Sequence, residues 1–212
     1  MTENGESSES SKGNKSGDGI RSGEAAGDTG GGRGGGLSRF GSLPVAGAVL
    51  TGIVAAYMAL VAFGNITDFG TNREFVRHVL AMDTTFRDED VMWRAIESRA
   101  LADVAYVGII VWETLAAAVL LGAVWLWVRG LRRGTRGDIG PARRTTTLGL
   151  LMVLLLFGLG FIVIGGEWFQ MWQSSDWNGL EPAGRNVMLA AFVLVLIHLP
   201  GARGNGEGER TP

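Results

Sequence analysis

Four apolar stretches divide this chain and constrain its fold more than any other feature of the sequence. They are Leu43–Gly64, Val104–Val128, Leu148–Gly166 and Val187–Leu199. The first three hold about 20 apolar or small residues each, which is what an α-helix needs to cross a hydrocarbon layer about 30 Å thick. The fourth reaches that length if the turn that begins at Leu180 lies among lipid headgroups. We therefore predict an all-α membrane protein, a bundle of four transmembrane helices.

The spans also define how the rest of the chain is organised. A transmembrane domain is expected over residues 43–200, with spans at about 43–64, 104–128, 148–166 and 183–199 and connections at 65–103, 129–147 and 167–182. Residues 1–42 are rich in Gly and Ser, and such a segment buries too little apolar surface to offset the entropy lost on ordering. We predict a disordered tail there and a second one at 201–212.

Basic residues predict the side of the membrane on which each connection lies. The connection 129–147 holds six arginines and a single acid, Asp138. The charged residues of the connection 167–182 are all acidic, Glu167, Asp176 and Glu181, and Arg185 just beyond it is the one cation. Lys and Arg are enriched on the cytoplasmic side of membrane proteins. We therefore expect a multi-pass protein of the cell inner (plasma) membrane, with both termini and the Arg-rich connection in the cytoplasm and the other two connections on the outer face.

The long first connection is expected to contain helices of its own. Apolar residues at helical spacing predict a short amphipathic helix over 72–82, which either lies on lipid or caps the bundle. Thr71 followed by Glu74 fits a capping box at its start. A second helix is expected from about Asp90, with Arg99 paired to Asp103, running without a break into the second span.

Tryptophans and small residues predict how the helices are anchored and packed. Trp125 and Trp127 close the second span at its cytoplasmic end, and other tryptophans flank the outer ends, where amphipathic rings prefer to lie. Ala48, Gly52 and Ala56 recur at a spacing of four on the first span. Such rows let membrane helices approach closely, so we expect this row to pack against a neighbouring helix of the bundle, with a contact between subunits of an oligomer as the alternative.

Composition excludes several kinds of site. The chain has no cysteine, which removes disulfides, thiolate nucleophiles, iron–sulfur clusters and Cys-ligated zinc. Its two histidines, His78 and His198, fall on opposite faces of the predicted membrane topology, so one subunit cannot form a two-His haem or metal site. We expect no metal and no cofactor.

Glu113 is the sharpest candidate for function within the spans. Ten residues from Asp103 at 1.5 Å each place it about 15 Å deep, near the midplane. An ionised carboxylate there costs about 2.5–3.5 kcal/mol, and no Lys, Arg or His lies at that depth. We predict a largely protonated carboxyl bonded to Thr51, Tyr57 or Tyr106, to backbone carbonyls, to water or to another subunit. Two interpretations stay open: the carboxyl handles protons or a ligand, or it locks helix packing.

Polar and aromatic residues in the two outer connections form a second set of candidates. A ligand pocket needs this mixture, and a structural lid over the bundle has the same composition, so both interpretations stay open. Glu167 and Arg185 face each other across the last connection and are expected to form an ion pair. No nucleophile accompanies a base, so no catalytic residue is predicted. The remaining candidates are Asp68, Asn72, His78, Asp83, Trp168, Trp172 and Gln173.

Several short motifs follow one another along the chain. They are Asn65–Asp68, Asn72–Val79, Met82–Thr84, Trp93–Ile96, Glu113 and Gly166–Ser174. Their order resembles one family of bacterial proteins, the predicted small integral membrane proteins grouped as domain of unknown function 2165. The resemblance covers about residues 43–199. It implies a four-helix membrane protein and brings no established activity, cofactor or catalytic residue.

Three classes of function compete on this sequence. The leading hypothesis is a non-enzymatic accessory or assembly partner of another membrane component. The alternative is a small oligomeric proton-coupled transporter or permease that uses Glu113, although no inverted repeat is evident. A membrane enzyme acting through Glu167, His78 and Asp83 is the third. The expected partners are the lipid bilayer and either another membrane protein subunit or a second copy of the chain, with no nucleic acid.

Overall fold

A computed structural model describes residues 42–133 and 139–200, and within these ranges the chain is helical and has no strand. Four helices are long and apolar enough to cross a membrane. They are α2 (Leu43–Thr67), α4 (Arg99–Arg133), α5 (Gly140–Leu154) continued by η3 (Leu155–Trp168), and α6 (Leu180–His198). The predicted four-helix membrane fold is confirmed. The expected disordered tails lie outside the described residues, except for Ser42, which precedes α2.

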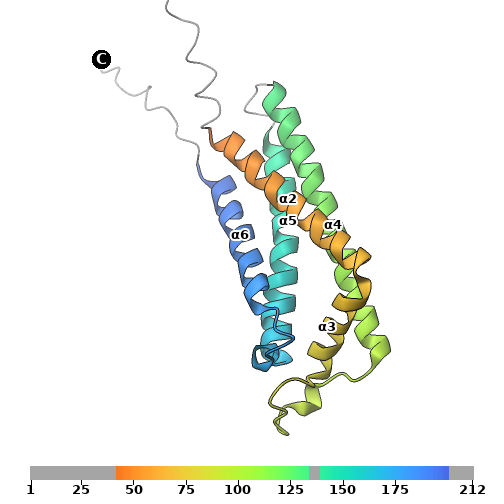
Figure 1. The fold of residues 1–212 in the computed structure, drawn as a ribbon. Helices are drawn as coiled ribbons and strands as arrows, with labels where there is room; N and C mark the ends of the chain where they lie inside the picture. The colour runs from red at the N-terminus through yellow and green to blue at the C-terminus, as the bar shows by residue number, and fades with distance from the viewer. Residues whose placement is uncertain (1–41, 134–138, 201–212) are drawn as a thin grey trace, which may run out of the picture. The chain divides into compact units, whose positions relative to one another are not determined.

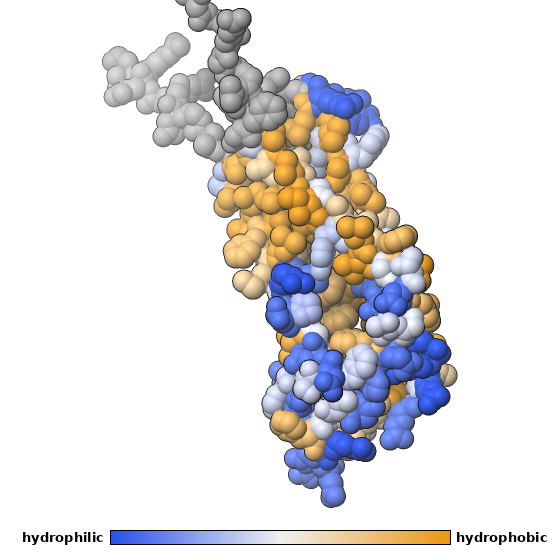
Figure 2. Space-filling view, viewed as in Figure 1, coloured by the Kyte–Doolittle hydropathy of each residue, from blue (hydrophilic) through white to orange (hydrophobic). Residues whose placement is uncertain are grey.

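The four helices pack as a closed ring. α2 lies along α4, α4 along α5, and α5 along α6, which returns to contact α2 (Figure 1). The interior is filled by apolar side chains such as Met58, Leu120 and Leu150, each almost fully buried. Large apolar side chains also cover the outside, and Figure 2 shows them as a band over the helices between two polar ends. A helix that is apolar all round suits contact with lipid.

The helices extend past the predicted spans. α4 continues to Arg133 and α5 begins at Gly140, so most of the Arg-rich connection predicted at 129–147 is helical. Residues 134–139 separate the two helices, and of these only Ile139, the N-cap of α5, lies within the described ranges. The apolar run of a sequence reports the thickness of hydrocarbon that a helix crosses. It does not report where the helix ends, because charged residues continue a helix readily at the membrane surface.

The amphipathic helix predicted at 72–82 is present as α3 (Phe69–Ala81). It packs against α4, so it caps the bundle at the end that carries the first and third connections. The capping box is wrong, because Thr71 and Glu74 both lie inside α3 and its N-cap is Asp68. The reason is that α2 runs on to Thr67, so only one residue separates the two helices.

The segment between α3 and α4 is not the continuous helix expected from Asp90. It holds one short 3₁₀ turn, η1 (Met92–Arg94), and an extended stretch before α4 begins at Arg99. The amide of Ile96 donates to the carbonyl of Leu80 at 2.7 Å, which holds this stretch against the end of α3.

The third span changes from an α-helix to a π-helix at Leu155 and keeps that form to Trp168. Gly166, near its end, is buried where η3 meets α6, and a Cβ at this position would lie 2.8 Å from Leu180 Cδ2. A larger residue at this position would displace the end of the Leu180 side chain. Beyond η3, the chain turns at Gln170 with a φ of 55° and forms a second 3₁₀ turn, η4 (Met171–Gln173), before α6.

The predicted packing row on the first span is wrong. Ala48 packs against the core, but nothing lies within 4 Å of a Cβ built on Gly52, and Ala56 is exposed, so the row as a whole is not the packing face of α2. The buried face of α2 instead carries Gly47 and Thr51. The closest glycine contact lies between α5 and α4, where a Cβ on Gly149 would fall 2.6 Å from Leu120.

The two tryptophans near the end of α4 differ in environment. Trp125 is 58% exposed beneath the guanidinium of Arg129, as expected of an interfacial anchor. Trp127 is only 2% exposed and donates its indole N–H to the hydroxyl of Thr146 at 2.9 Å. The expectation that Trp127 is an interfacial anchor is therefore wrong. Residues two positions apart on an α-helix lie on nearly opposite faces, so Trp127 faces the bundle when Trp125 faces outward.

Candidate functional site

Glu113 lies inside the bundle, 1% exposed, and its partner comes from α2. The side-chain amide of Asn65 donates to Glu113 Oε2 at 2.6 Å. The hydroxyl of Tyr106 donates to the backbone carbonyl of Asn65 at 2.8 Å. Two residues of α4 thus hold one residue of α2, and the carboxyl is partnered within the protein.

Of the partners expected for Glu113, Tyr106 alone lies in this network, and it acts through Asn65. Thr51 donates to the carbonyl of Gly47 and meets Thr146 instead. Tyr57 packs against the apolar core. Asn65 was missed because the first span was expected to end at Gly64. A buried carboxyl with no cation nearby needs a hydrogen-bond donor. The position of Asn65, directly after the first predicted span, was the sequence signal that could have identified it as that donor.

The position of Asn65 also revises the depth of Glu113. Asn65 is in the last turn of α2, so Glu113 is level with the end of that helix and not with its middle. Counted from Trp127 at the opposite end of α4, Glu113 lies about 21 Å away along the helix.

The two connections at this end of the bundle form a structured lid. We use this name for α3, residues 82–98 and residues 169–179. α3 is fixed to α4 by Asp103, whose carboxylate accepts hydrogen bonds from Arg73, with one Nε–Oδ1 distance of 2.6 Å, and from Arg77. Glu74 also pairs with Arg77 at 2.5 Å. The hydrogen bond between Arg73 and Asp103 raises the pKa of Arg73 above its ordinary value, so the guanidinium stays charged.

His78 and Asp83, two of the predicted candidates, lie together in the lid. Nδ1 of His78 lies 2.8 Å from Asp83 Oδ2, and its ring stacks on Trp177 at 4.5 Å between centroids. A carboxylate that orients an imidazole is one part of a nucleophilic site. No hydroxyl of the described residues bonds to the other ring nitrogen of His78. Asp83 thus fixes the imidazole within the first connection, and the stacking of His78 on Trp177 ties α3 to the last connection.

Trp172 and Gln173, also predicted candidates, meet Phe86 on the lid. The amide of Phe86 donates to Gln173 Oε1 at 2.8 Å, and the hydroxyls of Thr84 and Ser174 are 2.8 Å apart. The rings of Phe86 and Trp172 meet edge to face at 5.9 Å. Both rings stay open to solvent, with Phe86 72% and Trp172 47% exposed. We call this pair the Phe86–Trp172 surface.

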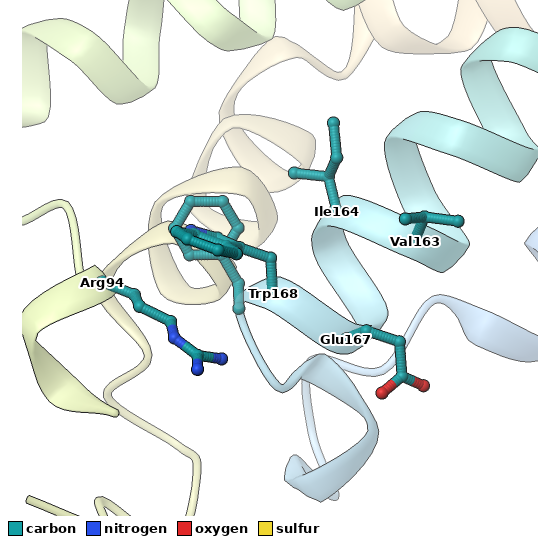
Figure 3. Close-up of a pocket in the computed structure, with 6 residues that line it drawn as sticks. Arg94, Val163, Ile164, Glu167 and Trp168 are labelled. Carbon is teal, nitrogen blue, oxygen red and sulfur yellow. The ribbon is translucent and has the colours of Figure 1, made fainter. Parts of the chain in front are cut away.

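Glu167 and Trp168 line a cavity of about 520 Å³ beside the lid. Figure 3 shows it between η1, which supplies Arg94, and the end of η3. Its other lining residues are Val163, Ile164 and Phe169. Within the described ranges no ion pair joins Glu167 to Arg185, so that prediction is wrong. Both side chains are exposed, where an ion pair gains little over hydration.

The sequence places this architecture in a family. Residues 43–200 match the family described as predicted small integral membrane protein, DUF2165. The chain belongs to this family. The matched region includes all four long helices and the whole lid. No curated protein and no solved structure matches the sequence. The chain is thus a multi-pass integral membrane protein, and the DUF2165 description carries no activity.

The last two predicted candidates of this DUF2165 protein have local structural roles. Asp68 joins α2 to α3, and its backbone carbonyl accepts a hydrogen bond from the Asn72 side chain at 3.2 Å. Sequence reasoning missed Phe86 and Arg94 as site residues, and it missed Asn65 as the partner of Glu113. The first two lie in irregular segments, where no periodicity signals which side chains meet.

Proposed function

We propose that this protein is a non-enzymatic accessory or assembly partner of another membrane component, which it binds through the Phe86–Trp172 surface. The observation that carries the proposal is the exposure of Phe86, 72%, on a segment held in place by hydrogen bonds. Exposed apolar rings on an ordered surface are typical of protein interaction sites, where aromatic residues supply much of the binding energy.

The backbone around Phe86 supports a built surface. Thr84 and Phe86 both form hydrogen bonds with residues of the last connection, Ser174 and Gln173. The two outer connections therefore hold the Phe86 ring in place together. Arg87 follows with a φ of 58°, a left-handed conformation that is uncommon outside glycine. A ring that only needed burial would fold back, whereas these contacts keep it facing solvent.

The charges beside Phe86 favour a protein partner over lipid. Arg87, Asp88, Glu89 and Asp90 follow it in sequence and all four are exposed. Charged side chains are costly inside hydrocarbon, so this part of the lid suits water at the membrane surface. Together with the Arg-rich connection at the opposite end, this supports a lid on the outer face of the plasma membrane and termini in the cytoplasm.

The contacts of Glu113 support a packing role in preference to transport. Its carboxyl is enclosed by Asn65 and is absent from the lining of the cavity beside the lid. A transport site needs access from both sides of the membrane, and the described helices close around this residue. The proposal therefore assigns Glu113 to the bundle and the lid to the partner.

The test is a comparison of matched variants extracted from native membranes in a mild, lipid-retaining detergent. Tagged wild-type protein, Phe86→Ala, Trp172→Ala and the control Phe192→Ala would be analysed for co-purifying proteins at fixed stoichiometry. Phe192 is an apolar ring of similar exposure, 70%, on the side of α6. We expect one partner with the wild type and the control, and its loss from both lid variants. Purification as a lone chain, or a partner retained by both lid variants, overturns the proposal.

A further inference from the structure

The cavity beside the lid holds two opposite charges that do not meet. Arg94 and Glu167 both line it, and neither side chain forms a hydrogen bond or an ion pair with another described residue. We propose that this cavity binds the headgroup of an aminophospholipid, with the phosphate on Arg94 and the primary ammonium on Glu167. This inference is independent of the partner proposed for the Phe86–Trp172 surface.

Arg94 is held in place by aromatic rings and lacks a polar partner. Its guanidinium carbon lies 4.9 Å from the ring centroid of Trp168 and 5.5 Å from that of Trp93. The two indoles meet edge to face at 5.6 Å. Nε of Arg94 is buried without an acceptor. An unpaired buried donor is costly, and a guanidinium matches the geometry of phosphate oxygens.

Glu167 makes the cavity selective for a particular headgroup. Figure 3 shows its carboxylate at the end of η3 and the Arg94 guanidinium extending from η1. A ligand that carries both an anion and a cation complements these two charges. A purely anionic headgroup would satisfy Arg94 and repel Glu167. A quaternary ammonium has no N–H to donate, so a primary amine is the better fit to the carboxylate.

The rest of the cavity favours a lipid over a soluble zwitterion. Val163 and Ile164 are 51% and 44% exposed on η3, and they line the cavity beside the two charges. They belong to the apolar span, so an acyl chain can follow them into the hydrocarbon while the headgroup stays at Arg94. Arg and Trp side chains are placed at this depth in many membrane proteins, where headgroups meet hydrocarbon.

Native mass spectrometry on the full chain tests the proposal. Delipidated protein in detergent would be mixed with equal amounts of phosphatidylethanolamine, phosphatidylglycerol and phosphatidylcholine that share the same acyl chains. We expect the ethanolamine lipid to be retained about tenfold more than the other two, the worth of one charge-assisted hydrogen bond. Equal retention of all three lipids, or a preference for either of the others, overturns the proposal.

Two variants assign the charges. Glu167→Gln should equalise the ethanolamine and glycerol lipids, and Arg94→Gln should reduce retention of both. Glu181→Gln and Arg185→Gln are the controls, because both are exposed charges on α6 outside the cavity. Since Glu167 is exposed, its variant keeps the fold even if the Arg94 variant loosens the lid. An unchanged lipid preference in Glu167→Gln, or full displacement of the lipid by soluble phosphoethanolamine, contradicts the assignment.

Discussion

Asn65 and Glu113 bind each other across the α2–α4 interface, with 2.6 Å between Nδ2 and Oε2. Tyr106 fixes the backbone of Asn65 from one side, so the amide is directed at the carboxyl. Glu113 is buried and Asn65 is half-buried, so the hydrogen bond offsets the cost of removing the carboxyl from water. The bond therefore defines how the end of α2 is positioned on α4.

This pairing predicts different effects of two substitutions. Asn65→Leu leaves the carboxyl of Glu113 without a donor and should lower the free energy of unfolding by about 0.6–1.7 kcal/mol, the range for hydrogen bonds between membrane helices. Glu113→Gln retains an oxygen that accepts from Asn65 and should change stability by less. Unfolding in mixed micelles of mild detergent and dodecyl sulfate measures both. A loss in Glu113→Gln as large as in Asn65→Leu would mean that the negative charge itself carries the interaction.

The α4–α5 contact predicts opposite effects at two glycines. A methyl on Gly149 would lie 2.6 Å from Leu120, so Gly149→Ala should destabilise the bundle by about 1–3 kcal/mol through overpacking. Gly122→Ala adds a methyl into open space on α4 and should be neutral or stabilising by up to about 1 kcal/mol. Thermal unfolding in detergent compares them, and Leu120→Val should partly rescue Gly149→Ala. Equal stability of the two alanine variants would show that the helices are not packed this closely.

The neighbouring tryptophans of α4 give a third matched pair. Trp127→Phe removes the indole N–H that donates to Thr146 and leaves space in the core, for a loss of about 1–3 kcal/mol. Trp125→Phe alters an exposed ring and should change the stability by less than about 0.5 kcal/mol. The same thermal measurement applies. If Trp125→Phe proves the more destabilising change, anchoring at the membrane surface outweighs the buried contact.

The spans were predictable because one physical requirement, the thickness of the hydrocarbon, acts on composition alone. The sequence did not predict the rotation of each helix about its axis, that is, which of its faces is buried. α2 is apolar on every side, so the sequence holds no polar stripe that would show that Gly47, and not Gly52, faces the bundle. Trp125 and Trp127 illustrate the same limit, since one chemical preference was assigned to two opposite faces of α4.

Within the candidate site, the sequence pointed to single residues better than to their partners. Glu113, His78 and Asp83 stood out by type and position, and the last two do meet. The local pair expected between Arg99 and Asp103 lost to Arg73, which reaches Asp103 from another helix with two nitrogens. Such contacts depend on how α3 folds back, which no spacing within either segment records.

Asp103 gives the last prediction, because it joins the lid to the bundle. Its carboxylate accepts from both Arg73 and Arg77, and Asp103→Asn removes the charge that balances these two cations. We expect amide hydrogen exchange over α3 to rise while exchange in the interior of α4 and α5 stays unchanged. Asp176→Asn, an exposed acid of the last connection, is the control and should leave α3 protected. Arg73→Gln should produce a smaller rise, since Arg77 still reaches Asp103. Unchanged exchange over α3 in Asp103→Asn would mean that its apolar contacts, such as Phe75 on Phe161, are sufficient to hold the lid.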